Sequence, residues 1–574
     1  MSPSRNQAKN DLETVLQEIT AAEGSVKIAG LAGSERAFFL ARLVAIAGRP
    51  VTVLVPTETE IPTLAADIGF FLNSQNIGVQ MFPGYAISPF KTLPFHGETA
   101  AARIRTLYRM MTEAERWITI TSPEALMGRL MPRSMLSNAA ELVMAGEEWD
   151  RDALVRHLIA TGYNRTTLVE EPGDFAIRGG IIDIFSPLYP EPFRVEFFGD
   201  MVESIRFFSA THQRTLESTA EVVILPAREA IVSPENLSKA VARVRSAGAA
   251  AGLTTQNLRA LVDRLQKEGR LWDVEGLPSL LYPETATFWD FQPENALFVR
   301  MEPAAIRSAA EAAENRLHEA AESARADGKL WLPPDQVALP WTSCERWMDA
   351  ATRIDLSPLP TAEALPSESE TRVHHFSVED TAGMRDELSR NRSGESPFSP
   401  LTEWLREQRT AGRATILACA SPGRADRLQS LLESYSLQPV VRDTVPDRLR
   451  PGTLFLVRDT LSAGFVWPAG GVSVLTDAEI FGIHRKRRSP PRRGVRADLL
   501  TFEDLQPGEW VVHADHGIGR YDRLVNLKVN GTAGDFLLLE YRDGDKLYLP
   551  VDRMQVLQKY MGVDGVQPHL DKMG

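Results

Sequence analysis

Residues 30–37 have the outline of a phosphate-binding loop, and they are the first residues in the chain that could do chemistry. The run Gly-Leu-Ala-Gly-Ser-Glu-Arg-Ala lies between a predicted strand and a predicted helix. A working loop needs Gly-Lys-Ser/Thr, where the lysine reaches the β- and γ-phosphates and the hydroxyl holds Mg²⁺. Here Arg36 stands at the lysine position, Ala37 at the hydroxyl position, and Glu35 where a glycine would let phosphate approach. We therefore predict a degenerate loop that does not bind nucleotide, formed by Gly30, Gly33, Arg36 and Ala37.

No other pattern in the chain predicts a catalytic or metal site. His513 and His516 lie three residues apart, but without a third ligand nearby they make a poor metal site. Cys344 and Cys419 are the two cysteines of the chain, and their separation argues against a disulfide framework or a zinc site. We expect no catalytic residue, metal or cofactor in these residues.

A different kind of chemistry is suggested by the strand predicted at residues 193–198. Side chains alternate along a strand, so Arg194 and Phe198 share one face with Glu196, opposite an apolar face. An arginine and a large ring on one rigid surface are typical of a protein-binding hot spot. The alternative is structural, with Arg194 paired to Glu196 or Glu203 and Phe198 packed under a loop. Spacing alone leaves both open.

The longer stretch around this strand resembles a known module. Arg-Gly at 178–179, Ile-Asp-Ile-Phe at 182–185 and Arg-Val-Glu-Phe-Phe-Gly-Asp at 194–200 are similar to the adaptor module shared by the excision-repair protein UvrB and the transcription-repair coupling factor (Mfd) family. The resemblance implies that Arg178, Arg194 and Phe198 dock UvrA. UvrB keeps an intact phosphate loop and the coupling factor has a degenerate one, so residues 30–37 are similar to the latter.

The C-terminal residues predict short strands joined by tight turns, with Asn530-Gly531 and Asp543-Gly544 between alternating apolar runs. We expect a small SH3- or Tudor-like barrel. Its motifs Val-Val-His-x-x-His-Gly-Ile-Gly-Arg-Tyr and Lys-Leu-Tyr-Leu-Pro-Val resemble the polymerase-interacting domain that coupling factors share with CarD-type regulators. The resemblance implies that the strand near 523–529 pairs with the RNA polymerase β subunit, and that Leu527 is a key contact. The residues predicted on that face are Arg523, Val525, Leu527 and Val529.

Composition favours protein partners over nucleic acid. The 574 residues carry 63 basic and 76 acidic side chains, a net charge of −13, whereas duplex-DNA binders usually carry a basic footprint. We expect Arg103, Arg105 and Arg109 to be solvated helix charges, and DNA contact to be weak and confined to a basic linker at 483–500. No signal peptide or membrane-spanning run is evident, so we expect a cytoplasmic chain. The resemblance implies a bacterial monomer that is associated with the nucleoid through RNA polymerase.

The fold predicted for this length is multidomain α/β. A strand near Val373–Val378 is predicted to extend the third domain. The predicted parts are a UvrB-like α/β domain with the degenerate loop (1–135 and 226–345), an inserted α+β adaptor domain (136–225), a linker (346–399), a small α/β domain (400–482), the basic linker (483–500) and the CarD-like barrel (501–574).

These parts occur together in the coupling factor, so the resemblance implies an adaptor of transcription-coupled DNA repair that binds stalled RNA polymerase and recruits UvrA. In the family an ATP- and Mg²⁺-dependent DNA translocase of helicase superfamily two follows the barrel. Its motifs are absent from these residues, so we expect no enzyme activity in this chain. The alternatives are a standalone CarD-like transcription regulator, a UvrB-type ATP-binding subunit, or residual binding of another ligand in the degenerate loop.

Overall fold

The computed structural model divides the described part of the chain into two compact units. Four sheets lie in the larger unit, and a fifth lies in the smaller unit, which holds the chain from residue 487 onward. The described residues are 12–21, 24–72, 77–85, 90, 97–112, 116–232, 236–268, 277–358, 372–391, 396–482, 508–513, 517–529, 532–542, 545–550 and 557–559. Only the backbone is described at 267–268, 372, 512–513, 517–518, 526–529, 532–535, 550 and 557–559.

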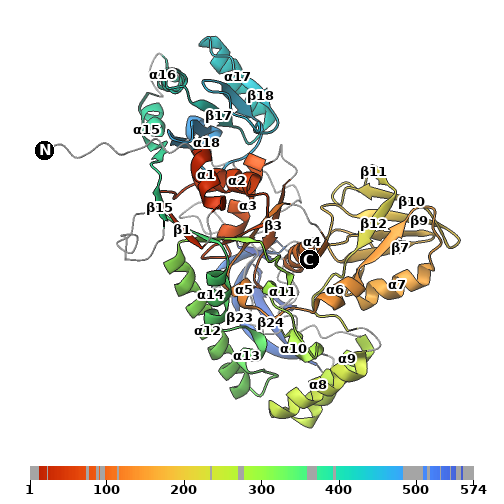
Figure 1. Ribbon diagram of the computed structural model, residues 1–574. Helices are drawn as coiled ribbons and strands as arrows, with labels where there is room; N and C mark the ends of the chain where they lie inside the picture. Colours follow the sequence, from red (N-terminus) through yellow and green to blue (C-terminus); the bar gives the residue numbers. More distant parts are fainter. Residues whose placement is uncertain are drawn as a thin grey trace. The chain divides into compact units, whose positions relative to one another are not determined.

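A parallel sheet of seven strands forms the centre of the larger unit (Figure 1). Its inner strands are buried runs of valine, isoleucine and leucine, as expected when helices cover both faces. In a parallel sheet the carboxyl ends of the strands share one edge, and the 30–37 loop follows the first strand at that edge. In spatial order the strands are β15 (Arg372–His375), β1 (Ser25–Ala29), β14 (Arg353–Ser357), β13 (Leu297–Met301), β2 (Val51–Leu54), β4 (Trp117–Thr121) and β3 (Gly78–Phe82).

The helices of the first domain come partly from residues before the inserted adaptor domain and partly from residues after it. The alanine-rich helix α12 buries one narrow stripe and leaves the rest to solvent, as a surface helix does. Within the described residues, no helix has both the length and the apolar character that a membrane span requires. The helices of this part are α1 (Leu12–Ala21), α2 (Glu35–Ala47), α3 (Glu60–Leu72), α4 (Gly97–Thr112), α5 (Pro123–Met127), α6 (Arg133–Ala139), α8 (Leu237–Ala250), α9 (Thr255–Glu268), α10 (Pro278–Leu281), α11 (Phe288–Phe291), α12 (Pro303–Ala326), α13 (Pro334–Val337) and α14 (Trp341–Ala350).

The linker predicted at 346–399 is wrong, because β14, β15, β16 (Glu379–Asp380) and α15 (Ala382–Asn391) all lie within it, and the last two belong to the third domain. Strand β14 lies inside the central sheet, between β1 and β13. Strand β15 pairs with β1, so the run predicted to extend the third domain belongs to the first. Strand β14 is not predicted from the sequence because Asp355 places a charge inside a buried strand. Arg300 of β13 neutralises that charge through hydrogen bonds of 2.6 and 2.7 Å to the two carboxylate oxygens.

The inserted domain is a six-stranded sheet with α7 (Arg151–Ala160) packed against one face (Figure 1). Asp150 caps α7 by accepting hydrogen bonds from the amides of Asp152 and Ala153. Gly199 has a φ of +63°, which a side chain would disfavour, and this turn reverses the chain as predicted. The strands are β11 (Thr215–Thr219), β10 (Met201–Phe208), β9 (Phe193–Phe198), β8 (Ile181–Ile184), β7 (Asp174–Arg178) and β6 (Asn164–Arg165); β5 (Glu141–Met144) and β12 (Glu221–Ile224) form a separate pair.

Helix α4 is tied to the insertion by arginines, so the prediction of solvated helix charge is wrong for Arg103 and Arg105. Arg103 is 3% exposed and forms a buried ion pair with Glu229, in the segment where the chain returns from the insertion. Burial is the largest influence on the pKa of Arg103 and would lower it, but the charge and hydrogen bonds of Glu229, together with Tyr85 and Glu58, outweigh burial and raise the pKa. Arg105 donates a hydrogen bond of 2.6 Å to the carbonyl of Pro187. Helical spacing could not reveal these partners, which are distant in sequence.

The third domain has a mainly parallel six-stranded sheet and shares a hydrophobic cluster with the first domain. Phe465 and Trp467 lie 6.1 and 6.0 Å from the ring of Phe38 in α2. The amide of Ser462 also donates to Asp67 of α3 at 2.9 Å. The strands are β16 (Glu379–Asp380), β20 (Phe465–Trp467), β21 (Val472–Thr476), β17 (Ala414–Ala418), β19 (Leu454–Val457) and β18 (Val440–Arg442); the helices are α15 (Ala382–Asn391), α16 (Ser399–Thr410), α17 (Pro422–Ser434) and α18 (Asp477–Phe481).

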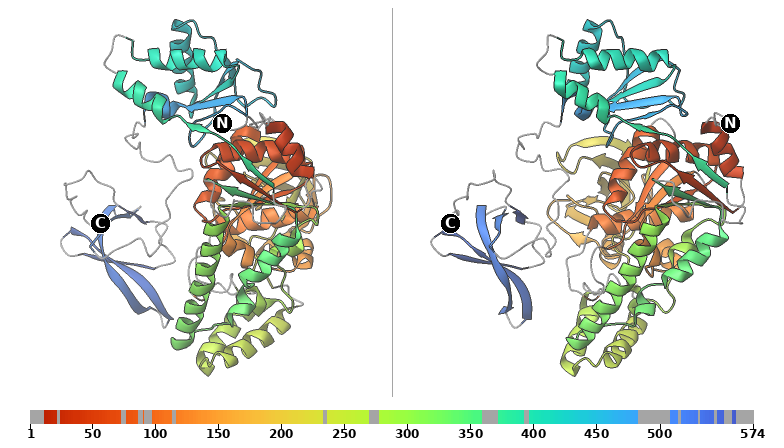
Figure 2. Two further views of the ribbon diagram at one scale, coloured as in Figure 1. Left: turned by 60° about the vertical axis from the view of Figure 1, so that its left-hand side comes forward. Right: turned by 90° about the vertical axis from the view of Figure 1, so that its left-hand side faces the viewer.

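The smaller unit contains an antiparallel five-stranded sheet, drawn in blue in Figure 2. A compact apolar core forms around Tyr521, Leu537 and Leu539. The strand pairings of the described residues do not close this sheet into a barrel, so the barrel stays a prediction. In spatial order the strands are β25 (Lys546–Pro550), β24 (Thr532–Glu540), β23 (Gly517–Val529), β22 (Trp510–His513) and β26 (Leu557–Lys559).

Candidate functional site

Arg194 is held on the outer face of the inserted sheet by a carboxylate of the neighbouring strand. Arg194 of β9 lies opposite Asp183 of β8 in register, and its guanidinium donates to both carboxylate oxygens at 2.6 and 2.8 Å. These hydrogen bonds raise the pKa of Arg194. The guanidinium carbon also lies 5.1 Å from the ring centre of Phe208. The pair fixes the direction of the side chain and leaves it one-quarter exposed.

The structural alternative for this face is wrong in both of its parts. Glu196 pairs with Arg206 at 2.8 Å, so neither Glu196 nor Glu203 is the partner of Arg194. Phe198 does not pack under a loop, because 81% of its surface is exposed. Arg178, the third residue of the expected docking set, ends β7 on the same face of the sheet. Its guanidinium donates to the carbonyl of Thr167 at 2.7 Å.

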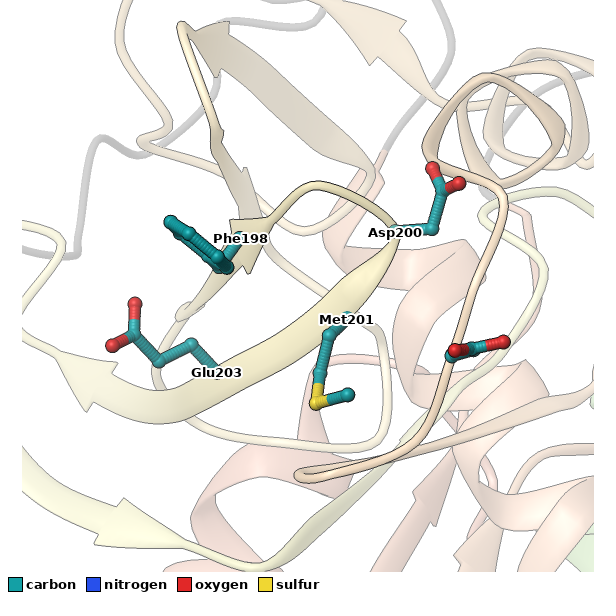
Figure 3. Close-up of a pocket in the computed structure, with 5 residues that line it drawn as sticks. Phe198, Asp200, Met201 and Glu203 are labelled. Carbon is teal, nitrogen blue, oxygen red and sulfur yellow. The ribbon is translucent and has the colours of Figure 1, made fainter.

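The tip of the β9–β10 hairpin has features that the sequence did not predict. Met201 lies opposite Phe198 in register and is 44% exposed. With Glu148, Asp200 and Glu203, these two side chains line an open hollow of about 500 Å³. Figure 3 shows the labelled side chains standing out from the ribbon around the turn. The Gly-Asp turn was a signal for the hairpin, but nothing in the sequence places residue 148 beside it.

The 30–37 loop uses its own carboxylate as the acceptor for its amides. Oε1 of Glu35 accepts hydrogen bonds from the amides of Ala32 and Gly33 at 2.6 and 2.7 Å. Glu35 is 6% exposed. Backbone amides of such a loop are the groups that hold phosphate in a nucleotide-binding protein. Glu35 therefore takes the place of an anion, in addition to carrying the repulsive charge that the sequence indicated.

Neighbouring segments cover the same loop. A Cβ at Gly30, where φ is +97°, would lie 2.0 Å from the carbonyl oxygen of Phe376 just beyond β15. The Ser34 hydroxyl donates to the carbonyl of Ala463 in the third domain at 2.7 Å. Arg36 is turned toward Glu302, 3.3 Å away. Ala37 is fully buried in the core.

Strand β23 has a long section with one edge that no other described strand pairs with. On one side it pairs with β24 from Arg520 to Val529, with Leu527 opposite Gly534. On the other side β22 pairs only with residues 517–520, and the amide of Gly508 and the carbonyl of Glu509 bond to Tyr521. Beyond Tyr521, no pairing on that side occurs among the described residues. Arg523 is exposed and Val525 half-buried, whereas the side chains of Leu527 and Val529 lie outside the described ones.

The described residues contain no cluster of three or more candidate metal ligands. His516 lies outside them, so the histidine pair cannot be placed. Cys344 and Cys419 are buried, and burial raises the pKa of both thiols to about 12. A thiol with so high a pKa is a poor nucleophile near neutral pH, because the thiolate is the reactive form.

Comparison with known proteins identifies two domains. Residues 142–229, which contain the Arg194 face, match the UvrB interaction domain. Residues 505–561, which contain β23, match the CarD-like/TRCF RID domain. The inserted sheet and the C-terminal sheet are therefore modules of defined families.

Full-length relatives agree with this assignment. A transcription-repair-coupling factor of Myxococcus xanthus is 33% identical over 98% of this chain and 47% of that protein. Those of Bacillus subtilis and Escherichia coli are each 26% identical over 95% of this chain and 46% of their own length. The chain is similar to transcription-repair-coupling factors over nearly its whole length, and it spans about half the length of the curated relatives it matches.

If Glu35 fills the loop, Mg²⁺–ATP should leave the melting temperature of the larger unit unchanged. A ligand at one hundred times its Kd would stabilise the fold by about 2.7 kcal/mol, which a thermal-shift titration detects. Glu35→Ala should lower the melting temperature without nucleotide, because two loop amides lose a charged acceptor, at a cost of about 1.5–3 kcal/mol each. A rise in the wild-type melting temperature with Mg²⁺–ATP would contradict the degenerate-loop prediction and favour a UvrB-type ATP-binding subunit.

Proposed function

We propose that the chain is an adaptor of transcription-coupled repair, which binds RNA polymerase through β23 and UvrA through the Arg194 face. The observation that carries this proposal is the presence of two different docking features in one chain. One is a rigid sheet face with an exposed ring, in a UvrB interaction domain. The other is a strand edge that is unpaired among the described residues, in a CarD-like/TRCF RID domain. An adaptor needs two such surfaces on separate modules, and the two compact units supply them.

The Arg194 face has the physical properties of a preorganised docking site. Interface hot spots are enriched in arginine and aromatic side chains held in a fixed geometry. Asp183 holds Arg194 by two hydrogen bonds, so little side-chain entropy is lost when a partner binds. Phe198 extends from the same strand with most of its ring available. These observations support UvrA as the partner of Arg178, Arg194 and Phe198.

The unpaired edge of β23 suits strand addition. A partner strand can bond to the free backbone groups, which supply affinity, while alternate side chains supply specificity. The section from Arg523 to Val529 is held in extended form by β24 on its other side, so it needs no folding on binding. We infer that the RNA polymerase β subunit provides the added strand and that Leu527 contacts it.

We assign no catalytic step, cofactor or metal to this chain. The loop that could have held nucleotide is occupied by Glu35 and covered by Phe376. ATP-driven translocation, with its Mg²⁺, is proposed to belong to parts of the family outside these residues. The adaptor is expected to act as a monomer in the cytoplasm beside RNA polymerase, with DNA contact limited to the 483–500 linker.

Replacing Phe198 with alanine should weaken UvrA binding about thirtyfold, which corresponds to about 2 kcal/mol for a hot-spot ring. Leu216→Ala is the matched control, because Leu216 is 56% exposed on β11 of the same sheet. The affinity of each variant for purified UvrA is measured by surface plasmon resonance. If both variants bind as tightly as wild type, the proposed UvrA surface is wrong, and a polymerase-binding regulator becomes the better description.

Replacing Leu527 with arginine should abolish measurable binding to RNA polymerase, because a charge at the middle of an added strand disrupts its contact face. Tyr548→Arg is the control, since Tyr548 is 44% exposed on β25, which pairs with the opposite side of β24. Co-elution with the polymerase and the melting temperature are measured for each variant. Loss of binding in the Tyr548 variant alone would place the contact on the other edge of the sheet.

A further inference from the structure

The arginines of the docking face are already engaged within the domain. Arg194 is bound to Asp183, and Arg206 to Glu196. Arg178 donates to the carbonyl of Thr167. Each of these guanidinium groups therefore donates hydrogen bonds within its own domain, and the opposite charges of the two ion pairs cancel locally. The positive charge that this face offers to a partner is smaller than its arginine content suggests.

The carboxylates around Phe198 have the opposite property. Glu148, Asp200 and Glu203 are exposed, and none of them forms an ion pair among the described residues. Together with Phe198 and Met201 they line the hollow at the hairpin tip. Asp200 belongs to the hairpin turn, while Glu203 lies at the irregularity in the pairing of β10 with β9. The segment before α7 supplies Glu148, whose backbone forms an isolated antiparallel β-bridge with Met201. We call Glu148, Asp200 and Glu203 the acidic rim.

We propose that the acidic rim receives a lysine or arginine side chain of the partner protein that docks on Phe198. This inference rests on the proposed function, and it states the chemistry of the partner's contact surface. The exposed ring of Phe198 lines the hollow, and the quadrupole of an aromatic ring attracts a cation placed over its face. The rim carboxylates accept its hydrogen bonds, which are strong because both groups are charged. The thioether of Met201 adapts to the apolar part of the incoming side chain.

Charge complementarity also decides the class of partner. A nucleic acid would bring phosphates toward three carboxylates, and this repulsion opposes binding. A basic protein surface gains attraction as it approaches, so the acidic rim should act mainly on the rate of association. The partner thus combines an apolar pocket for Phe198 with a basic group at the edge of that pocket.

The test is to neutralise the acidic rim without changing its shape. Asp200→Asn with Glu203→Gln removes two charges, and asparagine is well tolerated in a tight turn. Glu217→Gln with Glu221→Gln is the control, because both residues are exposed on the same domain and the loss of charge is equal. Association with purified UvrA is followed at low and high salt. We expect the rim variant to associate about tenfold more slowly at low salt, and this difference to close at high salt. The control pair should stay within about twofold of wild type.

The outcomes separate this inference from the proposed function. Equal slowing in both double variants would show a general effect of net charge and overturn the acidic-rim proposal. If Phe198→Ala loses binding while the rim variant binds as wild type, the rim proposal fails and the UvrA surface stands. If Phe198→Ala and the rim variant both bind as wild type, both proposals fail. Melting temperatures of all variants establish that each one is folded.

Discussion

The buried ion pair between Arg103 and Glu229 fixes how helix α4 lies against the segment that follows the inserted domain. It joins a helix of the first domain to the segment where the chain returns from the inserted sheet, and both side chains are about 4% exposed. Burying either charge without its partner would cost on the order of several kcal/mol of folding free energy. The two segments are therefore held in one arrangement. Asp355 in the central sheet is neutralised in the same way by Arg300. Glu35, whose charge is met by loop amides, follows the same rule.

This constraint explains which surfaces remain for partners. Charges that hold the fold together are satisfied inside the chain, and so are the arginines of the docking face. Among the described residues, the surfaces that remain are an exposed ring beside carboxylates without ion pairs at one hairpin tip, and a strand with one unpaired edge in the other unit. Two surfaces of different chemistry on separate units are what a connector between two proteins requires. In the 30–37 loop, the backbone amides donate to the carboxylate of Glu35, and the third domain contacts the loop through Ala463.

Local patterns in the sequence predicted what depends on neighbouring residues. Period-two alternation placed Arg194 and Phe198 on the outer face of their strand, and the Gly-Asp turn was located correctly. Partners from other strands could not be predicted. Asp183 meets Arg194 only because of the register between β8 and β9, and Glu148 reaches Met201 from a segment about fifty residues away. Strand β14 was missed because Asp355 breaks its apolar run, and Arg103 looked like a surface charge because helical spacing does not reveal a distant carboxylate.

The central claim is that one chain connects RNA polymerase and UvrA, and the most direct measurement is assembly of all three purified components. Size-exclusion chromatography with mass determination distinguishes a three-component complex from pairs. The account predicts that the chain, saturated with RNA polymerase, still binds UvrA with unchanged affinity, because the two surfaces lie on separate compact units. A complex containing only one partner at a time, or none, would contradict it.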